Sequence, residues 1–380
     1  MKYYIIAGEA SGDLHAANLM KEILARDPHA DFRFWGGDKM QAVGGTLVKH
    51  YRELAFMGFI EVAANIRTIM NNLNFCKKDI LSYKPDVMIL VDYPGFNLRI
   101  AEFAHQQGLK VIYYISPQVW AWKKSRIKKI KRDVDRMFVI LPFEKDFYAG
   151  YHYKVDFVGH PLLDALETSR EKNDLAAFKA KHQLDDRKII ALLPGSRKQE
   201  ISRILPVMLK AVAELPDYQA VIAGLAVNDP QLYAECAEGK TVKIVYNSTY
   251  DLLQNSVAAA VTSGTASLEA ALLGIPQVIC YKGSAISFAI ARRIVDVKYI
   301  GLPNLILDRE IVTELIQNDL TPAKLKQNLE ALLSDTEVRN RLEENYNLLR
   351  KKLGGPGASA RTATLLLSDL QSSASKSVGN

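Results

Sequence analysis

The chain has 380 residues, 48% hydrophobic and 24% charged, an ordinary globular composition with enough length for two domains. Its three cysteines, Cys76, Cys236 and Cys280, have no paired spacing. This argues against a disulfide framework or cysteine metal cluster and favours a reducing compartment. The net charge is +7, and the excess is concentrated, because seven of the ten residues from Lys123 to Arg132 (the basic run) are Lys or Arg. Such a run suits phosphates of a membrane lipid, a substrate or a nucleic acid.

Neither a secretory signal nor a membrane span is predicted. Glu9 and Asp13 interrupt the apolar N-terminal stretch too early for a signal peptide. No run approaches the ~18–20 apolar residues that a membrane-spanning helix needs. We therefore expect a cytoplasmic protein that is soluble or peripheral to a membrane.

The first half alternates strands and helices, which predicts a parallel sheet. The turn that follows the first strand, Gly8–Asp13, lacks the full G-x-G-x-x-G spacing, which argues against a dinucleotide site. The predicted strands are Tyr3–Ala7, Phe32–Trp35, Val87–Val91, Lys110–Ile115, Met137–Leu141 and Val155–Val158. The predicted helices include Leu14–Ala25 and Phe96–Gln107.

The segment from Phe56 to Phe75 is apolar apart from Glu61 and Arg67, with hydrophobic residues at helical spacing. The favoured interpretation is a helix packed on the sheet. The alternative is a face that meets acyl chains or a membrane, because large apolar residues gather at one end. Those residues are Phe56, Met57, Phe59 and Ile60.

Asp92 directly follows the strand Val87–Val91. In open α/β sheets, ligands bind at the carboxyl ends of the strands, so this carboxylate is placed to act as a general base. It is equally suited to cap the helix that begins near Phe96, and the residues alone do not choose between these roles.

Two of the three tryptophans, Trp120 and Trp122, lie in a loop directly before the basic run. Within the run Ile127 and Ile130 share a helical face with Val134, so the cations cover the other sides. One interpretation is a solvated helix beside a core loop, and the other is an aromatic platform for a sugar or lipid flanked by phosphate-binding cations. Nucleic acid is not favoured, because no recognised nucleic-acid motif appears.

The charged helical stretch from Leu163 to Asp186 predicts a crossover into a second alternating half. Helices are expected from Ala323 to Leu353 and from Ala358 to Leu370, and the Ser-rich tail Ser372–Asn380 is expected to fray. The predicted strands of this half are Lys188–Leu193, Gln219–Ala223, Val242–Val245, Val257–Val261 and Gln277–Cys280.

A strand-to-helix turn follows Val257–Val261 and contains Thr262, Ser263, Gly264 and Thr265. Backbone N–H groups and the helix dipole favour an anion there, such as a pyrophosphate. Glu269, on the first turns of the helix, could accept hydrogen bonds from a ribose diol. Alone, the turn is better interpreted as an ordinary helix N-cap at Thr262 or Ser263.

A second turn of this kind favours the nucleotide interpretation. After Lys188–Leu193, Gly195 permits close backbone approach, Ser196 offers a hydrogen bond and Arg197 offers bidentate phosphate contact. Two anion-suited turns in one Rossmann-like half predict a nucleotide-diphosphate site. Neither turn is a Walker A loop.

The chain resembles the lipid-A-disaccharide synthase family over nearly its full length. One departure is Gly95, where the family often has an acidic residue, so Asp92 remains the acidic group of that motif. The matching motifs, in order, are Gly-Glu-Ala-Ser-Gly-Asp (8–13), Met-Gly-Phe-Ile-Glu-Val (57–62), Asp-Tyr-Pro-Gly-Phe-Asn (92–97), Ser-Pro-Gln-Val-Trp-Ala-Trp (116–122), Pro-Phe-Glu (142–144), Val-Gly-His-Pro (158–161), Leu-Pro-Gly-Ser-Arg (193–197) and Thr-Ser-Gly-Thr-Ala-Ser-Leu-Glu (262–269).

The resemblance implies an α/β protein of GT-B fold, with two Rossmann-like domains whose mostly parallel sheets face each other across a cleft. We expect residues 1–163 to form the acceptor and membrane-associated domain, 164–353 the UDP-sugar domain, and 354–380 a C-terminal helix and frayed tail. The implied reaction joins UDP-2,3-diacylglucosamine to 2,3-diacylglucosamine 1-phosphate with inversion, giving a β-1,6 disaccharide and UDP. The resemblance further implies no cofactor or metal, peripheral association with the inner membrane, and a possible homodimer.

The resemblance also implies roles for individual residues, with Asp92 as the catalytic base. His15 is a rival base that we interpret instead as a helix surface residue, and His160 as a turn residue. Donor contacts are expected from Gly195, Ser196, Arg197, Thr262, Ser263, Gly264, Thr265, Glu269, Asn304, Glu314 and Gln317. Acceptor or membrane contacts are expected from Glu9, Ser11, Phe56, Met57, Phe59, Ile60, Asn97, Gln118, Trp120, Trp122, Lys123, Lys124 and Arg126.

Two other functions are compatible with the residues. A UDP-N-acetylglucosamine epimerase, or a transferase with another acceptor, would keep the fold and change the chemistry. A non-catalytic nucleotide-binding protein on a membrane surface would bind UDP without releasing it from a donor. An oxidoreductase fits poorly, because the glycine fingerprint is absent from the sequence.

Overall fold

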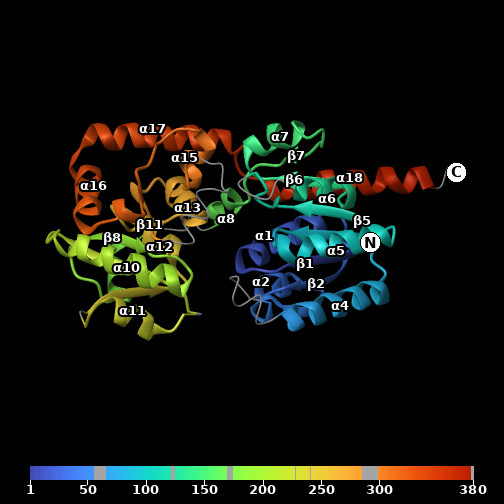
Figure 1. The fold of residues 1–380 in the computed structure, drawn as a ribbon, viewed down its shortest axis with the longest axis horizontal. Helices are drawn as coiled ribbons and strands as arrows, with labels where there is room; N and C mark the ends of the chain where they lie inside the picture. Colours follow the sequence, from blue (N-terminus) through green and yellow to red (C-terminus); the bar gives the residue numbers. More distant parts are fainter. Residues whose placement is uncertain are drawn as a thin grey trace. The chain divides into compact units, whose positions relative to one another are not determined.

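The computed structural model describes residues 1–54, 66–120, 125–168, 174–226, 228–239, 241–284 and 298–377. The chain divides into two compact units, one of Met1–Asp164 with Leu353–Asn380 and the other of Ala165–Lys352 (Figure 1). Each unit contains one parallel sheet. Among the helices within the described ranges, none is long and apolar enough to cross a membrane.

The first unit contains a seven-stranded parallel sheet with the order β3-β2-β1-β4-β5-β6-β7. The order reverses between β1 and β4, which lie side by side with Ala7 opposite Val91. The loops after these two strands therefore leave the same edge at the topological switch point. The strands are β1 (Lys2–Ala7), β2 (Asp31–Gly36), β3 (Thr46–His50), β4 (Val87–Val91), β5 (Lys110–Tyr114), β6 (Arg136–Val139) and β7 (Asp156–Phe157).

Helices cover both faces of this sheet, because its central strands are apolar on both sides. Successive residues of β1 enter opposite cores, with Tyr3 and Ile5 on one face and Tyr4 and Ile6 on the other. Helices α1 (Ala10–Leu24) and α18 (Ala358–Ser377) pack on the first face. The second face is covered by α4 (Ile66–Tyr83), α5 (Pro94–Gln106), α6 (Arg126–Asp133) and α7 (Pro142–Ala149). Helix α2 (Asp38–Val43) and the short helix η1 (Tyr51–Glu53) complete the unit.

The C-terminal helix α18 belongs to the first unit although it comes last in the chain. The Asp164 carboxylate accepts hydrogen bonds from the backbone N–H groups of Gly357, Ala358 and Ser359, which caps the helix N-terminus. Along the helix, Ala363 and Leu366 are fully buried in the core beside β1.

The second unit contains a six-stranded parallel sheet with the order β10-β9-β8-β11-β12-β13, whose switch point lies between β8 and β11. The strands are β8 (Lys188–Leu193), β9 (Tyr218–Gly224), β10 (Lys243–Tyr246), β11 (Ala258–Thr262), β12 (Gln277–Tyr281) and β13 (Glu314–Ile316). The helices are α9 (Leu175–Lys181), α10 (Lys198–Ala213), α11 (Pro230–Cys236), α12 (Thr249–Gln254), α13 (Thr265–Leu273), α15 (Leu302–Leu307), η2 (Gln317–Asp319), α16 (Pro322–Ser334) and α17 (Thr336–Lys352), and α8 (Leu162–Thr168) connects the two units along the chain.

All of the predicted strands are confirmed to within a few residues, but two strands are not predicted. Strand β3 is an edge strand of partly exposed, partly polar residues, and β13 has only three residues, so neither forms a clear apolar run. Helix α1 begins at Ala10, earlier than expected. The helical stretch expected from Ala323 to Leu353 contains two helices that are separated at Asp335, whose carboxylate accepts from the N–H groups of Glu337 and Val338 in the second helix. Helix α18 continues to Ser377, beyond the expected end at Leu370, and residues 378–380 of the tail that is expected to fray lie outside the described ranges.

Candidate active site

Asp92 lies at the end of β4, at the switch point of the first sheet. It adopts a left-handed backbone conformation (φ 45°), as does Tyr93 (φ 49°), which is costly for residues with a Cβ. Two side chains hold this turn by donating to the Asp92 carbonyl, the Asn97 amide at 2.7 Å and the Tyr113 hydroxyl at 2.6 Å. Strained backbone held by neighbouring side chains is typical of functional sites.

The loop after β1 lies next to this turn. Gly8 is required there, because a Cβ at that position would lie 2.3 Å from the Tyr93 ring. Glu9 follows at the N-cap position of α1. Burial, and then the negative charge of Glu9, raises the pKa of Asp92 to about 7. A carboxyl group with this pKa is suited to accept a proton near neutral pH.

The other predicted acceptor residues differ in their surroundings. Ser11 and Gln118 are exposed, whereas Asn97 is fully buried and its amide bonds to backbone carbonyls of the β1 and β4 ends. Trp120 packs edge-on against Phe143, with ring centroids 5.0 Å apart. Arg126 begins α6 and is partly exposed. Seven predicted residues lie outside the described ranges: Phe56, Met57, Phe59, Ile60, Trp122, Lys123 and Lys124.

Three buried polar side chains to which the sequence analysis assigned no role, Ser116, Glu144 and Tyr148, lie near the loop after β5. The Ser116 and Tyr148 hydroxyls lie 2.7 Å apart. Glu144 accepts from the N–H groups of Ile140 and Leu141 at 3.2 and 2.9 Å, and burial raises its pKa to about 7. The Pro-Phe-Glu motif at 142–144 was the only signal for it in the sequence.

The two histidines considered in the sequence are buried. The interpretation of His15 as a surface residue is wrong, because only 7% of it is exposed, and burial lowers its pKa to about 4. His160 accepts a hydrogen bond from the Leu162 N–H through Nδ1, as expected for a turn residue, and burial lowers its pKa to about 3. Both imidazoles are therefore neutral at physiological pH.

In the second unit, the two anion-suited turns leave neighbouring strands. Leu193 at the end of β8 pairs with Val261 of β11, so the turns that follow begin side by side at the switch point. Gly264 has a positive φ of 132° and is the N-cap of α13, which corrects the expected cap at Thr262 or Ser263. A Cβ at position 264 would meet no atom of the described residues within 4 Å, so this turn is open to a ligand.

The side chains around the α13 turn have separate roles. Thr262 is buried at the end of β11, and Thr265 is exposed at the first position of the helix. The Ser263 hydroxyl donates to the Ile300 carbonyl at 2.7 Å, so it ties the turn to the loop before α15. Backbone amides and the helix dipole at the start of α13 favour a bound anion.

The turn after β8 presents a cation. Gly195 has a φ of 104°, and Arg197 is the N-cap of α10 with 64% of its side chain exposed. Its guanidinium lies 3.6 Å from the Glu200 carboxylate. Ser196 is exposed, and its carbonyl accepts from the Asn228 amide at 3.2 Å. A solvent-facing Arg beside a glycine turn is suited to a phosphate ligand.

Glu269 lies one helical turn after Thr265 and is partly buried. Burial raises its pKa, and a hydrogen bond from the Tyr250 hydroxyl at 3.0 Å opposes this rise by stabilising the carboxylate. Tyr250 was not identified from the sequence, because a lone tyrosine on a short helix carries no motif.

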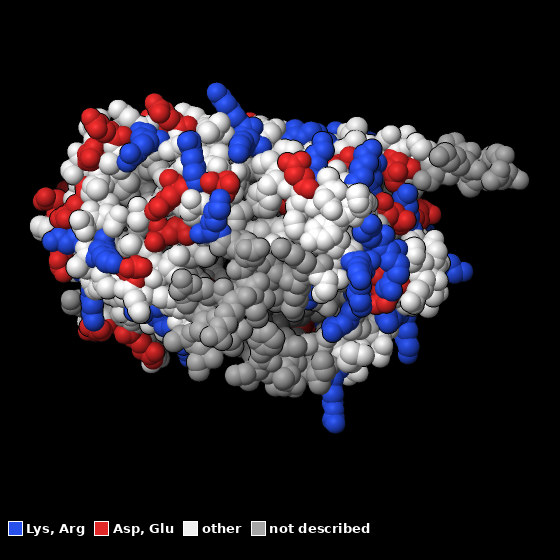
Figure 2. Space-filling model, turned by 45° about the horizontal axis from the view of Figure 1, so that its top comes forward, with Lys and Arg blue, Asp and Glu red and all other residues white. Residues whose placement is uncertain are grey.

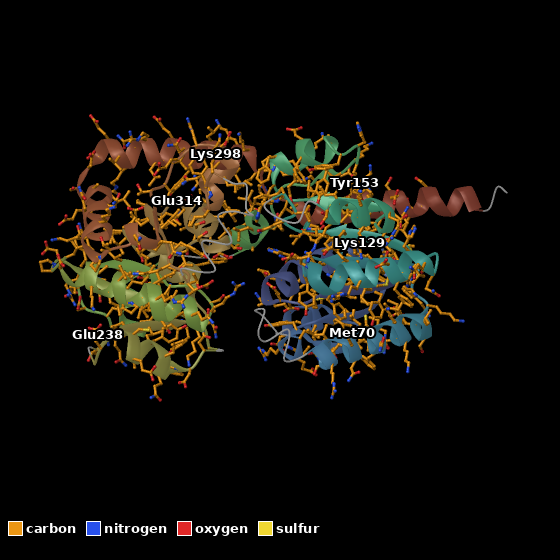
Figure 3. The ribbon with its side chains drawn as sticks, in the orientation of Figure 1. Met70, Lys129, Tyr153, Glu238, Lys298 and Glu314 are labelled. Carbon is orange, nitrogen blue, oxygen red and sulfur yellow. The ribbon has the colours of Figure 1, made fainter. Side chains whose placement is uncertain are left out.

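Three predicted donor residues make structural contacts beside β13. Asn304 is fully buried; its amide donates to Val312 and Glu314, and its oxygen accepts from the N–H groups of Ile311 and Val312. Glu314 also accepts from Ile300 and Gly301, and Gln317 accepts from the Gly283 N–H at 3.1 Å. Figure 3 labels Glu314 within the second unit. These contacts order the loops around the carboxyl edge, and direct contact with a donor stays a prediction.

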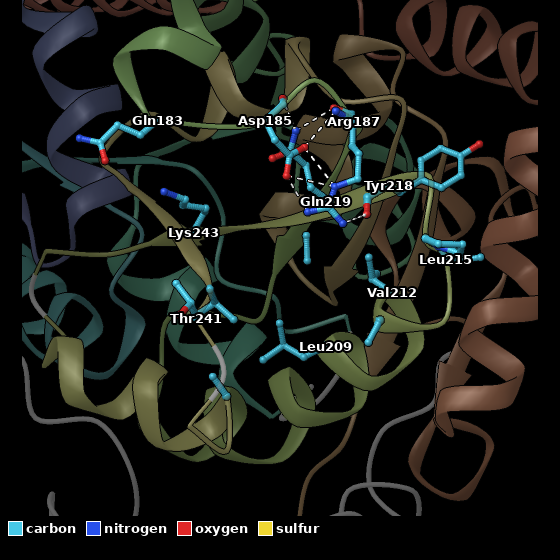
Figure 4. Close-up of a pocket in the computed structure, with 15 residues that line it drawn as sticks. Gln183, Asp185, Arg187, Leu209, Val212, Leu215, Tyr218, Gln219, Thr241 and Lys243 are labelled. Atoms are coloured by element: carbon cyan, nitrogen blue, oxygen red, sulfur yellow. Dashed lines mark hydrogen bonds and ion pairs between the residues drawn. The ribbon is translucent and has the colours of Figure 1, made fainter.

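A pocket of about 320 Å³ lies at the opposite edge of the same sheet (Figure 4). It is lined by residues at the amino ends of β9 and β10, including Tyr218 and Lys243, and by the ion pair of Arg187 with Asp185. Because ligands of parallel α/β sheets bind at the carboxyl edge, we assign it no part in the site. Within the described ranges, no three His, Cys, Asp or Glu side chains are grouped to hold a metal ion.

Comparison with known sequences gives matches over nearly the whole chain. The family model described as Lipid-A-disaccharide synthetase matches residues 3–367. The lipid-A-disaccharide synthase of Syntrophus aciditrophicus is 40% identical over 377 residues, which cover 97% of this chain and 98% of the relative. That of Coxiella burnetii is 34% identical over 367 residues, which cover 95% and 96%.

Solved structures similar to this chain share its two-sheet architecture at low sequence identity. The UDP-GlcNAc 2-epimerase of Neisseria meningitidis bound to UDP-GlcNAc has a TM-score of 0.69 at 15% identity, covering 97% of this chain and 100% of its own. A glycotransferase of kitacinnamycin has a TM-score of 0.63 at 16% identity, covering 97% and 99%. These likenesses confirm the GT-B fold. The sequence matches go further, and the chain belongs to the lipid-A-disaccharide synthase family of glycosyltransferases.

Proposed function

We propose that this enzyme transfers the sugar of UDP-2,3-diacylglucosamine to the 6-hydroxyl of 2,3-diacylglucosamine 1-phosphate. The acceptor oxygen bonds to the anomeric carbon of the donor while the bond from that carbon to the UDP oxygen breaks. UDP leaves with the bonding electrons, and the acceptor proton passes to a base. Attack opposite the leaving group inverts the anomeric configuration and gives a β-1,6 disaccharide 1-phosphate.

Asp92 is the base in this proposal, and its environment is the observation that carries it. The carboxylate stands at the switch point of the first sheet on a strained turn. Its pKa of about 7 makes the ionised form available at neutral pH and the protonated product stable. A carboxyl group with a strongly raised pKa at the ligand-binding edge of a parallel sheet is a candidate for proton transfer.

The donor diphosphate would bind at the turns after β8 and β11. Charge builds on the phosphate oxygens as the sugar leaves, so donors that are already oriented stabilise the transition state. Arg197 supplies a positive charge, and the amides at the start of α13 supply N–H groups and the helix dipole. Glu269 would accept hydrogen bonds from the ribose hydroxyls.

The first unit would also meet the inner-membrane surface from which the lipid substrates come. In α6, Ile127 and Ile130 are buried, and Lys128, Lys129 and Lys131 are exposed on the other sides. Figure 2 shows Lys and Arg side chains gathered on the part of the surface that this unit forms. An exposed basic face of this kind attracts anionic lipid headgroups or the acceptor phosphate.

The reaction is tested with the purified protein, both diacyl substrates and detergent, in buffer with a chelator. Formation of a disaccharide phosphate with one UDP released per product would support the proposal. A protein that binds UDP but releases none from the donor would contradict it.

The same assay addresses the epimerase alternative, which the solved neighbours raise because several of them are such enzymes by name. Incubation with UDP-GlcNAc alone should leave the sugar configuration unchanged. Epimerised nucleotide sugar in the absence of any acceptor would instead support that alternative.

A further inference from the structure

A side-chain pair joins α12 to α13 next to the turn after β11. The Tyr250 hydroxyl donates to Oε1 of Glu269 at 3.0 Å, and both side chains are partly buried. Glu269 lies four residues after Thr265, so it is on the same side of α13 as the first residue of the helix. The pair therefore lies one helical turn from the start of α13 and the preceding turn at Gly264.

The hydrogen bond from Tyr250 restricts the orientation of the Glu269 carboxylate. A glutamate side chain has three rotatable bonds, and without a partner it would sample several orientations. A phenol that donates to Oε1 fixes the plane of the carboxylate and stabilises its charged form. Because the group is partly buried, such stabilisation matters more than it would in water.

We propose that Tyr250 is a positioning residue that orients the Glu269 carboxylate to accept hydrogen bonds from the ribose diol of a uridine nucleotide. Tyr250 thereby sets the preference for a ribonucleotide over a deoxyribonucleotide. This inference rests on the proposed donor site, since it assumes that Glu269 contacts ribose.

Arg350 and Tyr346 of α17 form hydrogen bonds near the C-terminal end of α13, away from Glu269. Arg350 of α17 donates to the Leu272 carbonyl at 3.1 and 2.8 Å, and the Tyr346 hydroxyl donates to the Ile275 carbonyl at 3.2 Å. Burial and the Tyr250 hydroxyl, not these groups, shift the pKa of Glu269. Tyr346→Phe is therefore a matched control, because it also removes a hydroxyl that bonds in this region.

The experiment measures dissociation constants of UDP and 2′-deoxy-UDP by calorimetry with the full-length enzyme, and takes their ratio as the ribose preference. The parent should prefer UDP by about tenfold, as expected for a lost hydrogen bond to a charged group. Glu269→Gln should remove most of this preference. Tyr250→Phe should lower it several-fold, and the double variant should behave like Glu269→Gln alone.

The pH dependence gives a second readout. Without the phenol, the pKa of Glu269 should rise further, so the UDP affinity of Tyr250→Phe should fall more steeply than that of the parent as the pH is lowered. Tyr346→Phe should lose thermal stability and keep both the ribose preference and the parent pH profile.

The outcomes separate the inference from the proposal on which it rests. If Glu269→Gln binds UDP and 2′-deoxy-UDP as the parent does, the proposed ribose contact is wrong. If Glu269→Gln loses the preference while Tyr250→Phe retains the parent ratio and pH profile, the donor site stands and the role of Tyr250 is overturned.

Discussion

Two carboxylates at the first switch point, Glu9 and Asp92, are close enough for one to affect the proton affinity of the other. A hydrogen bond from the backbone of Tyr93 acts to lower the pKa of the Asp92 carboxyl group, but it is the smallest of the effects on this group. Here the pKa of Asp92 is raised, with burial as the larger cause. The backbone carbonyl of Asp92, not its carboxylate, receives the bonds from Asn97 and Tyr113.

Replacing Asp92 by Asn should lower turnover by ~10²-fold or more, because the amide cannot accept the acceptor proton. The affinity for UDP should stay near that of the parent. Steady-state kinetics and calorimetry check the two quantities, and near-normal turnover would remove Asp92 as the base.

Replacing Glu9 by Gln should shift the pH profile of kcat/KM. Removing the nearby negative charge lowers the pKa of Asp92 from about 7, so the ionised base persists to lower pH and the ascending limb moves in that direction. Glu22→Gln, further along α1, is the control because that side chain pairs with Arg26. An unmoved limb in Glu9→Gln would contradict the electrostatic coupling.

At the scale of the element, the proposed donor site depends on the backbone conformation of the turn between β11 and α13. Gly264 combines a φ of 132° with open space on the side where a Cβ would project, as far as the described residues reach. A side chain at this position would strain the turn and also intrude on the side where a ligand would bind.

Gly264→Ala should therefore reduce UDP affinity markedly and lower the free energy of unfolding by about 1–3 kcal/mol. Gly239→Ala, also at positive φ but at the end of α11, should show the strain and keep UDP affinity. Calorimetry and denaturant unfolding give the two quantities. Equal UDP affinity in Gly264→Ala and the parent would show that no diphosphate approaches this turn.

The exposed face of α6 should contribute to membrane binding. Replacing Lys128 and Lys131 by Gln should weaken sedimentation with vesicles rich in phosphatidylglycerol, and the difference should shrink as salt is raised. Lys351→Gln with Lys352→Gln, on exposed positions of α17, carries the same charge change in the other unit. If both double variants partition alike, α6 has no special role.

At the scale of the whole molecule, the last helix completes the first unit. Leu366 of α18 is fully buried in the core that contains Tyr3 and Ile5 of the first strand. The stability of the first sheet therefore depends on α18, a helix that begins more than 350 residues after the first strand of that sheet.

Leu366→Ala should destabilise the protein by about 2–5 kcal/mol, the range for removing a buried leucine. Hydrogen exchange should show the loss of protection in β1 and α1 rather than in the strands of the second unit. Uniform loss across both units would contradict the assignment of α18 to the first unit.

Prediction from the sequence was most accurate where one local rule decides the outcome. Apolar runs such as Val87–Val91 and Lys188–Leu193 are confirmed as strands with the predicted bounds, because a fully buried parallel strand must be apolar along its length. Ordered motifs identified the family, since eight of them match in sequence. Asp92 and Arg197 were correctly placed at the carboxyl edges of their sheets, because each residue follows a predicted parallel strand within a few positions.

The sequence by itself thus determined the alternation of strands and helices, because this depends on composition and spacing along the chain. Its ordered motifs identified the family, and with it the fold class, by resemblance. Only the tertiary structure decided that Glu9 acts on Asp92, that Tyr250 meets Glu269, that Asn304 is used internally and that His15 is buried. Those features arise from side chains that are distant in sequence or that turn to one particular face. Their charges and hydrogen bonds depend on distance and burial, which a linear pattern does not contain.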